Sequence, residues 1–154
     1  MGEATYYLKA RFASAEDAER VFEDFKTALA RLYDLNERWQ AMRDKRELAC
    51  AQRRVLLSRE FRDLEGMVPW GAIDEHCRSF ASGDAPMNCC AGEMPDIGGD
   101  PQVEVNGDEI WLSDMVWHST SWDGVAHWLR QRGATGVGWI SDEYTSPWDA
   151  VALE

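Results

Sequence analysis

The residues best suited to metal chemistry are His76, Cys77, Cys89 and Cys90. Zinc accepts imidazole nitrogen and thiolate sulfur, and structural zinc sites usually draw their cysteines from pairs spaced so that both thiolates reach one ion. Cys89 and Cys90 are adjacent, which does not match that spacing. A disulfide from Cys77 to either of them would need an oxidising compartment, and in a reducing one the thiols stay free. We therefore expect neither a metal nor any other cofactor.

Acid–base chemistry has one candidate motif, the sequence His118-Ser119-Thr120. Enzymes that cleave phosphodiesters with histidine–x–threonine motifs use two of them, one acting as acid and one as base. Neither His76 nor His127 begins a second copy. The alternative is a histidine at the end of a strand, followed by a serine that caps a helix. A small metal-dependent hydrolase or phosphodiesterase centred on His118 is thus an alternative function, and the chain is more simply explained as a non-enzyme.

Carboxylates near expected strand ends could also bind a divalent cation or act as acid and base. They are Asp108, Glu109, Asp114, Asp142 and Glu143. Without a recognisable spacing, carboxylates in such an acidic chain are more often solvated surface groups. The sequence also lacks the glycine-rich motifs that cradle nucleotide phosphates.

Charge divides the chain into two parts. Residues 1–66 hold 13 basic and 13 acidic residues, whereas residues 67–154 hold 3 basic and 15 acidic residues, so the whole net charge of −12 comes from the second part. Residues 38–62 carry eight basic residues against three acidic ones and could contact phosphates. Nucleic-acid-binding domains are normally basic as a whole, so direct nucleic-acid binding is not expected.

A concentrated negative field favours association with basic surfaces. We therefore predict a non-enzymatic interaction protein that binds a basic protein or protein complex, including one that normally holds nucleic acid. Tryptophans often anchor interfaces, and eight are present. The predicted partner-binding residues are Asp84, Glu93, Asp96, Asp100, Glu104, Asp108, Glu109, Trp70 and Trp148.

In size and charge the chain looks like phage-encoded, anti-CRISPR-type inhibitors of bacterial defence complexes, which act as nucleic-acid mimics. That resemblance implies a protein that occupies and blocks a basic groove. A second alternative is a structural component of an oligomer, in which the surplus tryptophans line a symmetric contact.

The first elements are predicted from periodicity. Apolar and polar residues alternate over residues 4–12, which indicates a strand with one buried face. Ser14, with Asp17 three residues later, resembles a capping box. An apolar stripe at helical spacing then runs to Leu35.

An uninterrupted helix to residue 65 would be far longer than the average of about 11–12 residues. We therefore predict a break at residues 34–37, followed by a second helix whose apolar side holds seven residues and which ends at Gly66. That apolar side consists of Trp39, Met42, Ala49, Leu56, Leu57, Phe61 and Leu64. A short helix is predicted over residues 72–80, and four glycines and three prolines make residues 83–101 an irregular loop.

Regular structure returns with a hairpin signal, in which Val103 and Val105 precede Asn106-Gly107 and a strand to Trp117. A helix capped by Ser119 or Ser121 and ended by Gly133, then a strand over residues 137–144, follow. The order predicts an α+β domain of the ferredoxin-like βαββαβ type, with two helices on an antiparallel sheet. Residues 1–154 would form this single domain, with residues 36–100 as a helical and loop insertion.

The first residues lack a basic stretch followed by an apolar run, and no apolar run approaches membrane-spanning length. We therefore expect a cytoplasmic protein that does not engage a membrane.

Overall fold

The structure is a computed structural model that describes residues 3–45, 50–78, 94–117, 120–141 and 147–154. In these residues the chain forms an α+β fold with a four-stranded antiparallel sheet and five α-helices. The described helices include none that is both long enough and apolar enough to cross a membrane.

Strand β1 (Glu3–Arg11) forms where the sequence alternates. Tyr6, Leu8, Ala10 and the following Phe12 are buried in the core, so the predicted strand and its buried face are confirmed. Because successive side chains of a strand point to opposite faces, the odd-numbered residues of β1 lie on the other side of the sheet.

The strand order is β2-β3-β1-β4, and every neighbouring pair is antiparallel. Strand β3 (Glu109–Trp117) pairs with β1 along its whole length, from Glu3 opposite Trp117 to Arg11 opposite Glu109. Strand β2 (Gln102–Asn106) pairs with β3 only as far as Ser113, and β4 (Gly136–Ser141) pairs with the other side of β1.

Helix α1 (Ala15–Lys45) begins after Ser14, whose hydroxyl accepts a 3.1 Å hydrogen bond from the backbone of Asp17, as the capping pattern predicts. The predicted break at residues 34–37 is wrong, because the helix continues for a total of 31 residues. Leu35 and Trp39 both belong to the buried core, so the apolar stripe crosses the expected break without leaving the packed side. Neither glycine nor proline interrupts it.

A group of helices packs along the far half of α1. It comprises α2 (Cys50–Glu60), a 3₁₀ turn (Arg62–Leu64) and α3 (Trp70–Arg78). Leu57, Phe61 and Leu64 are buried as predicted, whereas Leu56, assigned to the same apolar side, is 47% exposed. Gly66 follows the turn with a φ of 93°, a conformation that glycine adopts readily, in agreement with its predicted role as a terminator.

The predicted hairpin is confirmed with a shift of one residue in its turn. Asn106 still pairs with Glu109, so the two connecting residues are Gly107 and Asp108, and Gly107 has a φ of 63°. Helix α4 (Asp123–Gln131) then leads through Gly133, whose φ is 103°, into β4. The tail, left undefined by the sequence, contains the short helix α5 (Pro147–Ala150).

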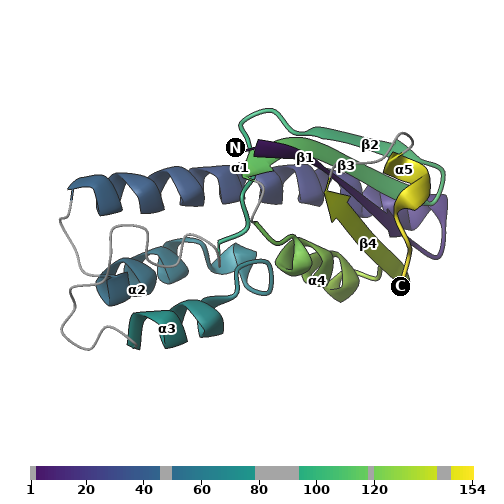
Figure 1. Ribbon diagram of the computed structural model, residues 1–154. Helices are drawn as coiled ribbons and strands as arrows, with labels where there is room; N and C mark the ends of the chain where they lie inside the picture. The colour runs from purple at the N-terminus through teal and green to yellow at the C-terminus, as the bar shows by residue number, and fades with distance from the viewer. Residues whose placement is uncertain (1–2, 46–49, 79–93, 118–119, 142–146) are drawn as a thin grey trace.

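Figure 1 shows that α1 runs the length of the molecule and joins two parts. We call the four strands with α4, α5 and the loop of residues 94–101 the sheet half, and we call α2, the 3₁₀ turn, α3 and the end of α1 beside them the helical half. Helices α1 and α4 cover the face of the sheet that carries the core, and α5 contacts β1 from the opposite side.

Candidate interaction surface

The face of the sheet turned away from α1 and α4 carries an unusual set of side chains. We call it the open face, and register places both side chains of every second opposed pair of β1 and β3 residues there. It comprises Glu3, Thr5, Tyr7, Lys9 and Arg11 of β1, Glu109, Trp111, Ser113, Met115 and Trp117 of β3, Gln102, Glu104 and Asn106 of β2, and Gly136, Gly138 and Ile140 of β4.

Three aromatic rings cluster at the middle of the open face. Trp148 of α5 stacks on Trp111 with ring centroids 4.7 Å apart, and it meets Tyr7 edge-on at 4.9 Å. The ammonium of Lys9 lies 4.7 Å from the centre of the Trp111 ring. Such pairs stabilise a fold beyond simple area burial. Trp148, predicted as an aromatic anchor for a partner, therefore makes its described contacts within the chain and is half-buried.

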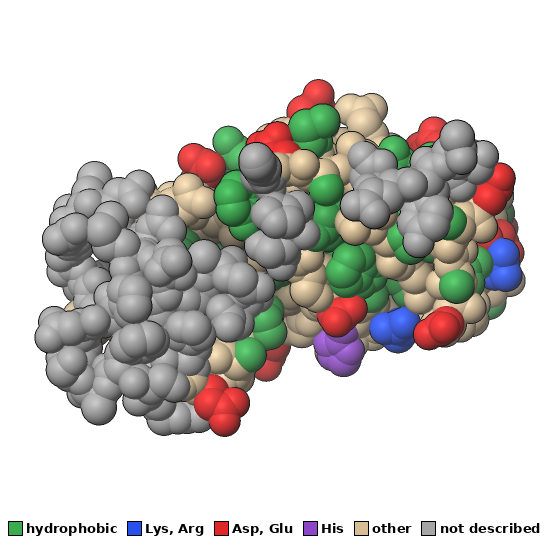
Figure 2. Space-filling view, in the orientation of Figure 1, with side chains coloured by type: hydrophobic (Ala, Val, Ile, Leu, Met, Phe, Trp, Pro, Cys, Tyr) green, Lys and Arg blue, Asp and Glu red, His purple; other side chains and the backbone are tan. Residues whose placement is uncertain are grey.

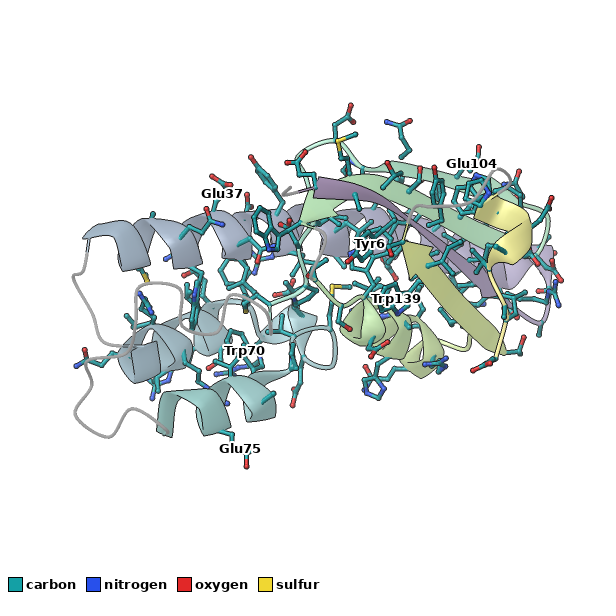
Figure 3. All side chains as sticks on the ribbon, viewed as in Figure 1. Tyr6, Glu37, Trp70, Glu75, Glu104 and Trp139 are labelled. Atoms are coloured by element: carbon teal, nitrogen blue, oxygen red, sulfur yellow. The ribbon has the colours of Figure 1, made fainter. Side chains whose placement is uncertain are left out.

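Two of the predicted acidic residues lie beside this cluster. Glu104 faces Trp111 across the β2–β3 pair, and Glu109 accepts hydrogen bonds from the Trp111 indole at 2.9 Å and from Arg11 at 2.6 and 3.0 Å. Burial raises the pKa of Glu109, but the hydrogen bonds from Trp111 and Arg11 outweigh it and hold that pKa below its usual value. The negative charge of Glu109 is therefore already paired within the chain, whereas Glu104 is exposed (Figure 3).

The C-terminal segment covers the β4 side of the sheet. A side chain at Gly138 would collide with the backbone oxygen of Ala152, and one at Gly136 would press against Leu153. The backbone groups of Val137 and Glu154 bond to each other, which places the segment along the outer edge of β4. Residues 147–154 and their Trp148 thus cover the open face only in part.

The end of β3 beyond β2 is the part of the open face with exposed apolar side chains. Met115 is 60% exposed and Trp117 is 52% exposed, the two largest values among the large apolar side chains that the structure describes. Glu3, which is also exposed, lies directly opposite Trp117. This end of the face therefore combines apolar area with negative charge.

Residues 94–101 take the place of β2 beside this end of β3. Asp96 accepts a 2.9 Å hydrogen bond from the backbone of Trp117, its own amide donates to the Thr120 hydroxyl at 2.9 Å, and its carbonyl accepts one from the Trp122 indole. The carbonyl of Met94, a buried residue two positions before Asp96, accepts a 3.2 Å hydrogen bond from the Thr120 hydroxyl. Asp96 is thus a structural residue as well as a predicted contact residue.

Three carboxylates gather along the same loop. Asp114 accepts hydrogen bonds from the backbone of Gly98 at 2.6 Å and of Met115 at 3.0 Å. Burial raises the pKa of Asp114, and the negative charges of Asp96 and Asp100 raise it further, against the lowering effect of those two hydrogen bonds. Among the described groups, no lysine or arginine contributes to this shift. The negative charge here lacks the compensation seen at Glu109.

Several described basic residues of α1 and α2 are, by contrast, paired. Arg31 holds Asp63 at 2.9 Å, Arg38 pairs with Glu60, and Arg54 pairs with Asp74. Arg53 is buried with its guanidinium 5.0 Å from the centre of the Trp39 ring. Three of the eight cations that the sequence offered for phosphate binding, Arg38, Arg53 and Arg54, are thus engaged in contacts within the chain.

Trp70, the other predicted anchor, belongs to this helical half. Its ring lies 5.4 Å from the guanidinium of Arg54, and it packs against the core. Figure 3 shows Trp70 among the helices and Glu104 toward the opposite end of the molecule. The two residues therefore do not belong to one contact surface.

The remaining candidates are placed as follows. Asp100 is exposed in the loop of residues 94–101, and Asp108 follows Gly107 in the hairpin turn. Asp84 and Glu93 lie outside the described residues, as do Cys89, Cys90, His118, Asp142 and Glu143, and so do the side chains of His76 and Cys77. Within the described part of the chain, no group of three or more His, Cys, Asp or Glu side chains is arranged to hold a metal ion.

Met115 and Trp117 were not selected as site residues from the sequence. A signal was available, because Trp111, Met115 and Trp117 are apolar at the alternation phase opposite to that of Ile110, Leu112 and Val116. A strand that is apolar on both faces needs a second covering layer or exposes apolar surface.

Comparisons of this chain with protein-family models, with curated proteins and with solved structures find no match.

Proposed function

We propose that this chain is a non-enzymatic interaction protein that binds a basic protein surface through acidic residues of its sheet half. The observation that supports the proposal best is the group of carboxylates Asp96, Asp100 and Asp114, in which burial raises the pKa of Asp114 and the negative charges of Asp96 and Asp100 raise it further. A partner that brings lysine or arginine to this loop would relieve the repulsion among these charges.

The distribution of charge over the described surface supports the same proposal. Figure 2 shows acidic side chains along the upper and right parts of the sheet half, next to apolar ones, with lysine and arginine only toward the right and lower edge. In the helical half, arginines are consumed by pairs such as Arg31 with Asp63. The acidic side chains described on the sheet half (Figure 2) thus lie on the same part of the molecule as the exposed Met115 and Trp117.

The proposal has two more specific parts, one on the partner and one on the scaffold. The partner would be a cytoplasmic protein or complex whose basic surface normally holds nucleic acid, as expected of a phage-type inhibitor that mimics nucleic acid. The scaffold would be a ferredoxin-like split unit with residues 36–100 inserted. Its support is that β3 lies between β1 and β2 and is antiparallel to both, which makes β1 and β2 parallel.

The test uses the intact protein as bait in a host lysate at about 50 mM salt, with elution at about 500 mM and identification of the eluted protein. The captured partner is then purified and its affinity measured for wild type and two doubly substituted variants. Asp100→Lys/Glu104→Lys reverses two charges of the sheet half, and Glu19→Lys/Glu37→Lys makes the same change of net charge on exposed positions of α1.

We expect the first variant to bind about tenfold or more weakly and the control to stay close to wild type, because only the first faces the partner. Equal losses in both variants would mean that net charge alone governs binding. An affinity that does not change between about 50 and 300 mM salt would contradict the proposal altogether.

A further inference from the structure

We propose that the partner docks on the exposed end of the open face, and that the docking element is a basic amphipathic helix. The apolar side of that helix would lie on Met115 and Trp117, and its lysines or arginines would face Glu3 and Asp96. This inference rests on the proposed function and assigns it a surface and a partner chemistry.

The exposed end of the open face offers apolar area to a partner. Met115 and Trp117 follow each other on the same face of β3, about 6.8 Å apart along the strand. Exposed methionine and tryptophan side chains side by side are typical of binding surfaces, because methionine adapts its shape and tryptophan buries a large area. In the middle of the open face, by comparison, Trp111 stacks on Trp148 of the same chain.

The charge beside this apolar area is negative. Glu3 lies opposite Trp117, and the Asp96 carboxylate accepts a hydrogen bond from the Trp117 backbone. The described cations of the open face are Lys9 and Arg11, which lie at its other end against Trp111 and Glu109. Charge complementarity therefore selects a cationic partner and disfavours nucleic acid, an anionic membrane and a second copy of this chain.

The face of the sheet favours a helix over an extended segment as the docking element. The face of a sheet offers no free backbone hydrogen-bonding groups, since these point sideways within the sheet. An extended segment laid on Met115 and Trp117 would lose water from its own backbone groups without replacing it. A helix satisfies its backbone internally, and its apolar residues four positions apart lie about 6 Å apart along the axis, which matches the spacing of the two side chains.

The test measures the affinity of the intact protein for a fluorescein-labelled amphipathic peptide of leucine and lysine, designed as a helix of about 14 residues, by anisotropy at about 50 mM salt. A peptide of the same composition in scrambled order, without an apolar side, is the matched probe. The surface variant is Met115→Thr/Trp117→Thr, which keeps strand-forming residues. The control variant is Val55→Ser/Leu56→Ser, which removes an exposed apolar pair of similar exposure, 43% and 47%, from α2.

We expect the surface variant to bind the amphipathic peptide at least about tenfold more weakly than wild type does. The control variant should bind this peptide within about twofold of wild type. Wild type should bind the scrambled peptide about tenfold more weakly than the amphipathic one. Equal binding by wild type and surface variant would overturn the inference. If Asp100→Lys/Glu104→Lys still abolished binding in that case, the proposed function would stand without it. Failure of both peptides to bind at low salt would count against both.

Two further measurements keep the inference testable. If the surface variant fails to fold by circular dichroism, wild type labelled with ¹³C-methyl methionine is titrated with the peptide. The Met115 methyl signal, assigned with Met115→Leu, must then shift while that of the buried Met67 does not, and an unmoved Met115 signal would overturn the inference. Light scattering of wild type is the other measurement, since a dimer that the surface variant loses would assign this face to a second copy and overturn it as well.

Discussion

The hydroxyl of Thr120 should be one of the most important single polar groups for stability, because it connects two parts of the chain. It accepts a 2.9 Å hydrogen bond from the Asp96 amide and donates one of 3.2 Å to the Met94 carbonyl, and Thr120 itself is buried. Thr120→Val keeps the shape of the side chain and removes both bonds. The amide and the carbonyl then stay in the protein interior without a partner.

Each orphaned buried group costs about 1–3 kcal/mol, so we expect Thr120→Val to lower the free energy of unfolding by about 2–4 kcal/mol. For a chain of this size that corresponds to a fall in Tm of roughly 5–15 °C. Urea denaturation followed by tryptophan fluorescence measures the free energy, and Thr120→Ser, which retains the hydroxyl, is the matched control. A Thr120→Val protein as stable as wild type would show that water or a rearranged loop satisfies both groups, and would refute the reasoning.

Two other predictions follow from the sheet half. Burial raises the pKa of Asp114, so the folded protein binds that proton more tightly than the unfolded chain. The resulting stabilisation is complete below the pKa that Asp114 has in the unfolded chain, and it is lost as pH rises through the pKa that Asp114 has in the folded protein. Denaturation measured across pH 3 to 7, about the range in which carboxyls titrate, should show this loss in wild type and not in Asp114→Asn. Identical pH profiles of the two proteins would contradict the prediction. Trp148→Ala should remove the stacked pair with Trp111, costing about 1–2 kcal/mol and abolishing any tryptophan exciton signal in circular dichroism. Trp70→Ala is the control that should leave that signal intact, and an unchanged signal in Trp148→Ala would mean that the stack does not form.

The local elements were largely predictable because their signals are short-range. Alternation over β1, the cap at Ser14 and the glycines at 107 and 133 each depend on residues within a few positions of one another. The predicted break in α1 failed because average helix length was used where the residues themselves gave no stop signal. Packing of Leu57 and Phe61 against the far half of α1 lets the helix continue.

The candidate surface was only partly predictable. Charge counts located the acidic surplus, and the structure brings Asp96 and Asp100 together with Asp114, which the sequence had considered only as a cation-binding or catalytic carboxylate. Trp148 and Trp70 were expected as anchors, yet both are packed within the chain. A tryptophan's identity does not reveal whether the chain itself has already used its ring.

From the order of its residues alone, this chain specifies a strand with one buried face, an amphipathic helix that begins after Ser14, a hairpin and an acidic second part. Those properties depend on side-chain period, turn residues and charge, which are local or additive. Which part of the sheet stays exposed depends on elements distant in sequence, since β2 ends its pairing at Ser113 and residues 147–154 return to cover the middle of the open face and its β4 side. Exposure of Met115 and Trp117 is therefore a tertiary property, because burial is decided by what packs on a side chain and not by its type.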